Sequence, residues 1–109
     1  MVLDFKKMEE TVNENFRGGE KKTFLSRFAD DLNKIMVGRL EPGASVGYHR
    51  HEEDSEVVYI LKGCGKFVLE NGEETVPEGS GHYCPKGEAH SLVNDGDTEL
   101  VFFAVVPKQ

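Results

Sequence analysis

The chain has no tryptophan, only two cysteines and no long run of apolar residues. Its most apolar stretch, Leu100–Val106, falls far short of the ~18–20 residues that a membrane-spanning helix needs. Cys64 and Cys84 are too few for a disulfide framework, and we interpret both as free thiols with structural roles. The first residues, MVLDFKKMEE, lack the apolar core of a signal peptide. We therefore expect a cytoplasmic protein with no membrane partner.

Positive charge is also scarce. Thirteen Lys and Arg residues stand against twenty Asp and Glu, which gives a formal net charge of −7. Contacts to phosphates need a basic surface, so this composition argues against a nucleic-acid partner. A length of 109 residues suits one domain with one modest core, and we expect residues 1–109 to form it.

Glycine, by contrast, is plentiful, and it divides the chain into short segments rich in Val, Ile, Phe, Tyr and Thr. This pattern is typical of an all-β domain with turns at short spacing. Asn71-Gly72 predicts a tight hairpin turn, because both residues tolerate positive φ. The predicted strands are Thr23–Arg27, Lys34–Leu40, Ser45–Arg50, Glu56–Lys62, Gly65–Glu70, Glu73–Val76, Gly81–Cys84, His90–Asn94 and Leu100–Val106.

The two ends of the chain depart from this alternating pattern. Residues 1–20 form an N-terminal arm, in which Met1–Asn15 holds either a strand or a helical turn. The last predicted strand, Leu100–Val106, is apolar on both faces. It should be buried on both sides, by a second sheet or by a partner subunit.

The most informative stretch is GYHRHEEDSEVVYILKG, residues 47–63. Side chains alternate along a strand, so His49 and His51 point to one face, about 6.5–7 Å apart at the backbone. After a turn over residues 52–55, an antiparallel hairpin would return Glu56 beside them as an oxygen ligand. Two solvated surface histidines are the alternative, and a third ligand elsewhere would favour a metal site.

His90 supplies that candidate, within GSGHYCPKGEAHSLVN, residues 79–94. Pro85 fixes its own φ and Gly87 permits a tight reversal, so a turn precedes His90 at the start of a strand. The alternative interpretation is that His90 only packs at a strand end.

Two motifs now stand out, at residues 43–63 and 79–94. The first reads Gly43, five residues, His49-Arg50-His51, four residues, Glu56, six residues, Gly63. The second reads Gly79, five residues, Pro85-Lys86-Gly87, two residues, His90, three residues, Asn94. Together they resemble the paired motifs of the cupin superfamily, in the form found in small single-domain members. The resemblance implies a double-stranded β-helix, or jelly-roll barrel, with one divalent metal held by His49, His51, Glu56 and His90.

Three imidazole nitrogens and one carboxylate suit a divalent transition metal, namely Fe, Mn, Ni, Co or Zn, at one ion per subunit. Four protein ligands leave two octahedral positions open for water or a small molecule. The resemblance implies either a metal-dependent enzyme on a small oxygen-rich metabolite, of dioxygenase, decarboxylase or sugar isomerase type, or a non-catalytic module that binds a carbohydrate or carboxylate through the metal. It also implies a homodimer.

Two further residues have alternative roles. His82 shares a strand face with Cys84, and it is either a catalytic acid–base group near the metal or a histidine satisfied by a backbone partner. Arg39 either reaches an anionic substrate or pairs with one of the many acidic residues.

Overall fold

The computed structural model describes residues 1–109 and is built almost entirely of strands. All nine predicted strands are present and differ only at their ends, and the arm adds a tenth. The single helical element is the short 3-10 turn η1. In chain order the elements are β1 (Thr11–Glu14), η1 (Phe16–Gly18), β2 (Lys22–Ala29), β3 (Asn33–Leu40), β4 (Ser45–Arg50), β5 (Glu56–Lys62), β6 (Cys64–Leu69), β7 (Gly72–Pro77), β8 (Gly81–Cys84), β9 (Ala89–Val93) and β10 (Leu100–Pro107).

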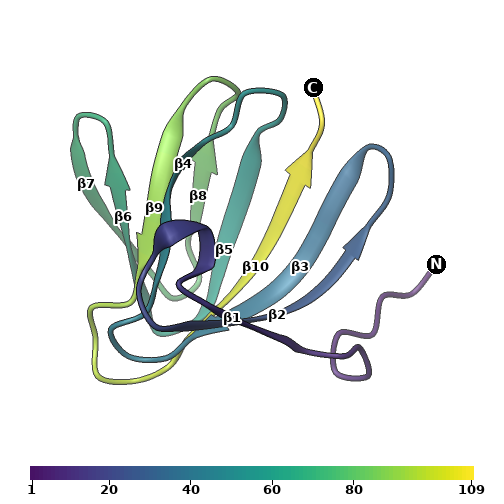
Figure 1. Cartoon of the computed structure of the whole chain (residues 1–109), viewed down its shortest axis with the longest axis horizontal. Helices are drawn as coiled ribbons and strands as arrows, with labels where there is room; N and C mark the ends of the chain where they lie inside the picture. Colours follow the sequence, from purple (N-terminus) through teal and green to yellow (C-terminus); the bar gives the residue numbers. More distant parts are fainter.

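The strands form two antiparallel sheets. One has the order β1-β2-β3-β10-β5-β8 and the other the order β4-β9-β6-β7. Figure 1 shows them as the facing walls of a barrel, with η1 lying against β4. The predicted all-β fold with jelly-roll architecture is confirmed.

The predicted hairpin between Ser45–Arg50 and Glu56–Lys62 is wrong. β4 pairs with β9, whereas β5 pairs with β10 and β8, so the two segments belong to opposite sheets. The connection between them steps from one sheet to the other, and Asp54 forms an isolated bridge with Lys108 on the way. Glu56 therefore reaches the histidines from across the barrel and not from a neighbouring strand.

The turn between β6 and β7 lies one residue earlier than predicted. Leu69 pairs with Gly72, which leaves Glu70 and Asn71 as the two turn residues. Gly72 adopts a φ of 143°, while Asn71 does not have a positive φ. The glycine thus supplies the unusual conformation as the first residue of the following strand.

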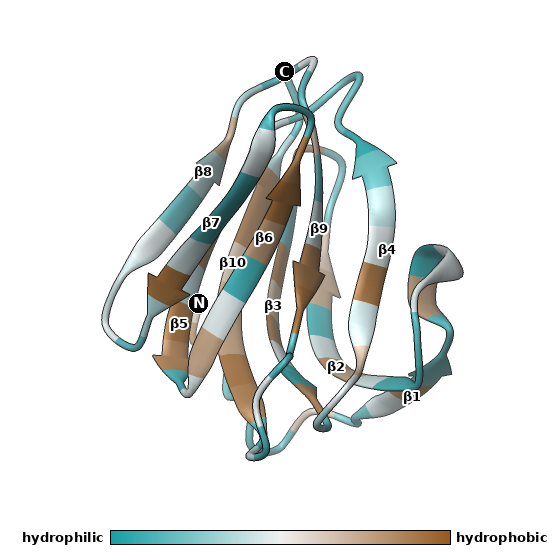
Figure 2. Ribbon diagram, turned by 90° about the vertical axis from the view of Figure 1, so that its left-hand side faces the viewer, coloured by the Kyte–Doolittle hydropathy of each residue, from teal (hydrophilic) through white to brown (hydrophobic).

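The core lies between the sheets, where alternate side chains of both walls meet. Figure 2 shows apolar residues concentrated on β5, β6 and β10 and polar residues along the edge strand β7. Fourteen apolar residues form one buried cluster, and its largest fully buried side chains are Phe67, Leu40, Ile60 and Leu100. This burial supplies most of the driving force for folding.

Within one chain, Leu100–Val106 is fully buried on only one of its two faces, so burial of the other face by a partner subunit stays a prediction. Every second residue of β10 is buried, and the residues between them are only partly covered. On the outer face, the ring of Phe5 contacts Phe103 edge-on, with centroids 6.1 Å apart. The N-terminal arm therefore covers part of this face, and the rest stays open.

Arg39 takes the second of its two predicted roles. Its guanidinium forms ion pairs of 2.7 Å with Glu10 and with Glu99, and it lies over the ring of Phe24. Arg39 is also absent from the walls of the main cavity. It therefore fastens the arm to the six-stranded sheet.

No helix of this structure has the length and apolar character needed to cross a membrane.

Candidate metal centre

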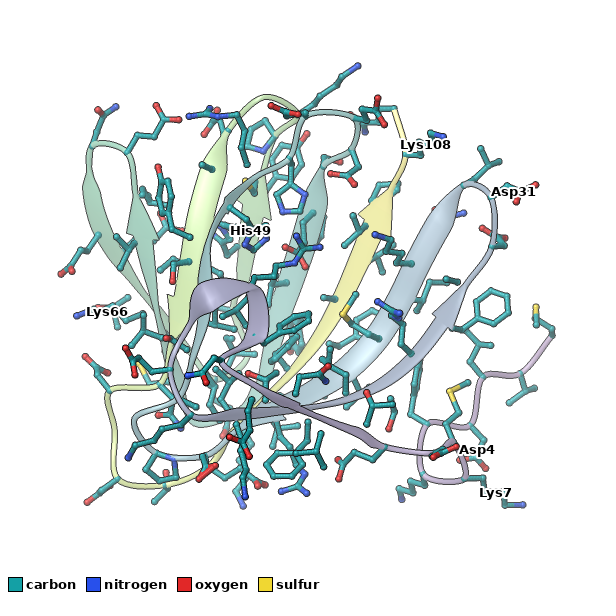
Figure 3. All side chains as sticks on the ribbon, viewed as in Figure 1. Asp4, Lys7, Asp31, His49, Lys66 and Lys108 are labelled. Atoms are coloured by element: carbon teal, nitrogen blue, oxygen red, sulfur yellow. The ribbon has the colours of Figure 1, made fainter.

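The four residues with predicted ligand roles come together at one end of the barrel. His49 lies on β4 directly opposite His90 on β9, so both rings leave the same face of one sheet. Glu56 opens β5 in the facing sheet. Figure 3 shows His49 in the space between the two sheets. We call this group the His–Glu cluster: His49, His51, Glu56 and His90.

His51 is held in place by the turn that precedes His90. Its backbone N–H donates to Glu88 at 2.9 Å, and the N–H of Gly87 donates to the His51 carbonyl at 2.6 Å. Gly87 can close this turn because it adopts a φ of 93°. The two sequence motifs are thus joined by backbone hydrogen bonds beside the cluster.

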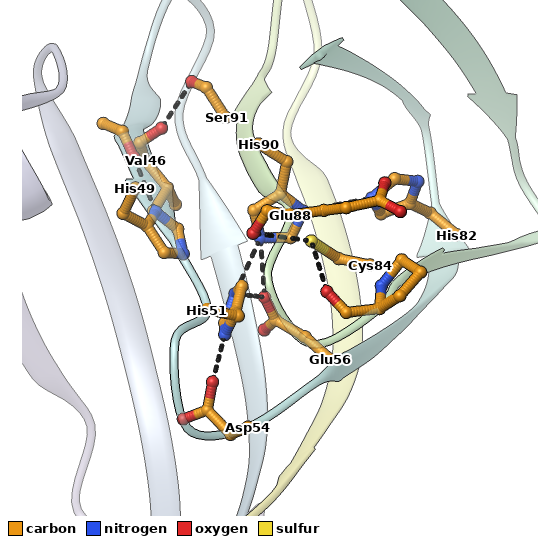
Figure 4. Close-up of polar contacts among 12 residues, drawn as sticks. Val46, His49, His51, Asp54, Glu56, His82, Cys84, Glu88, His90 and Ser91 are labelled. Atoms are coloured by element: carbon orange, nitrogen blue, oxygen red, sulfur yellow. Dashed lines mark hydrogen bonds and ion pairs between the residues drawn. The ribbon is translucent and has the colours of Figure 1, made fainter. Parts of the chain in front are cut away.

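The ligand atoms of the cluster all lie within 4.8 Å of one another (Figure 4). Glu56 Oε1 lies 3.2 Å from His51 Nε2 and 2.9 Å from His90 Nε2. The two Nε2 atoms are themselves 3.1 Å apart, and the His49 ring centroid is 4.9 Å from each of the other two rings. The inward-facing nitrogen and oxygen atoms of the four residues thus converge on a common point.

Hydrogen bonds on the far side of the rings indicate which nitrogens carry protons. His49 Nδ1 lies 2.7 Å from the Gly47 carbonyl oxygen, and His51 Nδ1 lies 2.6 Å from the Asp54 carboxylate. Both oxygens only accept, so we assign the proton to Nδ1 in each ring. The Nε2 lone pairs are then free to face inward. Inward-facing imidazole nitrogens and a carboxylate oxygen that all lie within 4.8 Å of one another are a donor set that fits a divalent metal ion.

The charges of the cluster agree with this assignment. Burial raises the pKa of Glu56, but its hydrogen bonds with His51 and His90 outweigh burial and bring that pKa down to about 2. Burial lowers the pKa of His49 to about 4, against the smaller opposing effect of the Gly47 carbonyl. The hydrogen bond to Glu56 raises the pKa of His51 and favours a proton on its Nε2, so a metal ion that binds there would displace that proton. Near neutral pH the carboxylate is ionised and His49 is neutral, as ligation requires.

His82 lies behind His90 and not on the cavity wall. Its Nε2 is 3.0 Å from His90 Nδ1, and its Nδ1 is 2.5 Å from Glu74 Oε1. Its ring stacks on Phe67 with centroids 3.8 Å apart, and this burial lowers its pKa. Its partners are side chains and not the backbone group that we considered.

Sequence reasoning missed Asp54 and Glu74, the two carboxylates behind the cluster. We assigned residues 52–55 no role beyond a turn, yet the Asp54 side chain is only 26% exposed and accepts from His51. Its position three residues after His51 could have indicated a hydrogen bond between the two side chains. Glu74 offered none, because it reaches His82 from a strand of the other sheet.

A cavity of about 240 Å³ opens beside the cluster. Its apolar wall includes Val58, Phe67 and Phe102. Cationic side chains also line it, namely Arg17, Arg27, Lys34 and Arg50, together with the acidic residues 52–54. The cavity therefore combines apolar surface with side chains of both charges.

Arg17 is placed at the cavity by direct contact between η1 and β4. A Cβ added to Gly47 would lie 1.9 Å from the Arg17 carbonyl oxygen, so only glycine permits this approach. Arg17 itself adopts a φ of 52°. Its guanidinium forms no ion pair, whereas Arg50 is paired with Glu70 at 2.7 Å. Arg17 therefore remains available to an anion in the cavity.

Comparison with other proteins places this site in a known family. A family model described as the cupin domain matches residues 36–106. An oxalate-binding protein of Thermotoga maritima is 41% identical over 100 residues, which cover 84% of this chain and 81% of that protein. A glucose-6-phosphate isomerase of Thermococcus onnurineus is 35% identical over 65 residues, but these cover only 34% of its length.

Solved structures agree. A predicted oxalate decarboxylase from Thermotoga maritima superposes with a TM-score of 0.93 at 30% identity, and the match covers the whole of both chains. A sugar phosphate isomerase of the cupin superfamily from Silicibacter pomeroyi gives a TM-score of 0.82 at 23% identity, over 100% of this chain and 76% of that chain, which shows likeness of fold alone. On the family match and these relatives together, this chain belongs to the cupin family.

Proposed function

We propose that this protein binds one divalent transition metal at the His–Glu cluster and uses it to bind a small carboxylate of oxalate size. The observation that carries the proposal is the convergence of imidazole nitrogens and an ionised carboxylate at the edge of a small cavity. The metal, one of Fe, Mn, Ni, Co or Zn, would supply a Lewis acid with open coordination positions. The four protein ligands would fix its place and leave those positions directed toward the cavity.

The ligand class follows from the cavity and from the relatives. A volume of about 240 Å³ accommodates a small metabolite. The unpaired guanidinium of Arg17 favours an anion, since arginine binds carboxylates through paired N–H donors. The oxalate-binding relative from Thermotoga maritima supports a dicarboxylate in particular.

Binding is the first candidate and turnover the second. Outside the cluster, the cavity offers no histidine, cysteine or lysine–carboxylate pair placed beside the metal ligands, and His82 lies behind His90. We therefore give His82 a positioning role. Enzymatic activity has one observation in its favour, because Glu52 and Glu53 line the cavity and could exchange protons with a bound ligand.

The experiment that tests the proposal starts with tag-free protein and elemental analysis per subunit. We expect about one equivalent of metal, as-purified or after reloading, and tight binding of oxalate to the loaded protein by calorimetry. The His51→Ala variant should lose most of the metal. Incubation of the loaded protein with oxalate, followed by assays for formate and carbon dioxide, separates binding from turnover. A wild-type protein that takes up no metal after reloading would contradict the whole proposal.

We further propose that two copies associate through the open outer face of the six-stranded sheet. Large apolar side chains on β5 and β8 are exposed there, namely Val57 at 47%, Tyr59 at 43%, Leu61 at 46% and Tyr83 at 58%. Patches of this kind mark interaction sites. Light scattering coupled to size exclusion should give twice the mass of the 12.2 kDa chain. A monomeric mass at micromolar concentration would contradict this second proposal alone.

A further inference from the structure

A line of side chains connects the His–Glu cluster to the surface of the molecule. Glu74 lies on β7, at the edge of the four-stranded sheet, and His82 lies on β8, at the edge of the six-stranded sheet. No backbone ladder joins these two edges. The contact of 2.5 Å between Glu74 Oε1 and His82 Nδ1 spans them, and His82 Nε2 continues to His90 Nδ1 at 3.0 Å.

The direction of every hydrogen bond in this line is determined by its outer end. The Glu74 side chain is 46% exposed, and an ionised carboxylate only accepts hydrogen bonds. His82 must then donate from Nδ1, so the Nε2 of its neutral ring accepts. His90 must in turn donate from Nδ1, and its Nε2 lone pair faces Glu56 and the cluster.

Burial and stacking hold the His82 ring in the orientation that makes these two hydrogen bonds. Its side chain is only 4% exposed, and it stacks on Phe67, which is fully buried. Its two nitrogens have no hydrogen-bond partners other than Glu74 and His90. If Glu74 were absent, His82 could place its proton on Nε2 instead, directed at His90.

We propose that Glu74 is a positioning residue for the metal centre, which acts through His82 to hold His90 in the tautomer that ligates. This inference rests on the proposed metal site and adds a residue that touches neither metal nor ligand. Partners behind metal-bound histidines commonly change metal affinity by about 10–100-fold. An exposed carboxylate at the edge of the four-stranded sheet would therefore set the metal affinity of a buried site.

The test compares zinc affinity, measured by competition with a chromophoric chelator, between Glu74→Ala and Glu73→Ala. Both residues are exposed acids on β7, so each variant removes the same charge, but Glu73 pairs with Lys66 and does not contact His82. We expect Glu74→Ala to weaken zinc binding about tenfold and Glu73→Ala to change it less than about twofold. Glu74→Gln keeps an accepting oxygen, so it should recover part of the loss.

A second pair of variants shows whether the effect passes through His82. In a His82→Phe background, where the accepting nitrogen is gone, Glu74→Ala should cause no further loss of zinc affinity. Equal losses in Glu74→Ala and Glu73→Ala, or the same Glu74→Ala loss with and without His82, would overturn the inference. If His82→Phe fails to fold, the three variants at the exposed positions still decide it. A wild-type protein that binds no zinc or other metal would instead remove the proposed function on which the inference rests.

Discussion

Replacement of Gly47 by alanine tests whether the contact between η1 and β4 builds the cavity. The added Cβ would lie 1.9 Å from the Arg17 carbonyl oxygen and 2.8 Å from the Gly19 nitrogen. Ordinary contact begins at about 3.4 Å, so η1 must move by about 1.5 Å. Backbone cannot rotate out of the way as a side chain can, so we expect a destabilisation of about 1–3 kcal/mol.

Two measurements follow from that displacement. The melting temperature of metal-free Gly47→Ala should fall by about 4–8 °C for each kcal/mol lost. Oxalate affinity of the metal-loaded variant should also fall, because Arg17 moves with η1. Zinc affinity should fall less, since the Gly47 carbonyl that accepts from His49 remains in the chain.

Gly81→Ala is the matched control for this variant. It also lies on a strand near the cluster, but the nearest atom to its added Cβ is the Val58 oxygen at 3.5 Å, an ordinary contact. We expect its melting temperature and oxalate affinity to stay close to those of the wild type. If Gly47→Ala behaved like Gly81→Ala in both measurements, the reasoning that η1 is fixed by direct backbone contact would be refuted.

Three further predictions concern the cavity, the pH response and the core. Arg17→Ala should weaken oxalate binding to the loaded protein by about tenfold or more while zinc affinity stays the same; equal oxalate affinity in calorimetry would remove Arg17 from the ligand site. The metal-free protein should lose stability on acidification. The pKa of His49 falls from 6.5 to about 4 on folding, so the unfolded chain binds its proton first and stability drops as pH falls from about 6.5 to about 4. Urea titrations at pH 7 and pH 5 should show this loss of stability, and it should be smaller in His49→Gln. If His49→Gln lost as much stability as the wild type, a group other than His49 would be its cause. Phe67→Ala should destabilise the chain by about 3–5 kcal/mol, because Phe67 is fully buried, and a loss below about 1 kcal/mol would contradict its place in the core.

The strands and the members of the His–Glu cluster could be predicted from the sequence because their signals are local. Alternation of apolar residues between glycines defines a strand without reference to the rest of the chain. The spacing of His49, His51 and Glu56 within one segment, and of Pro85 and His90 within another, carries the resemblance to cupins. The architecture then follows from the family and not from these residues alone.

Only the tertiary structure decided how these segments meet. Glu56 faces the histidines from the opposite sheet, Arg17 reaches the cavity from the N-terminal arm, and Glu74 supports His90 through His82. These contacts join strands that are distant along the chain, and they form only when two sheets close on one core. Likewise, Leu100–Val106 is apolar on both faces, but only one face meets the opposite sheet. Sequence periodicity predicts which side chains of a strand can be buried, and the packing of the sheets determines which of them are buried.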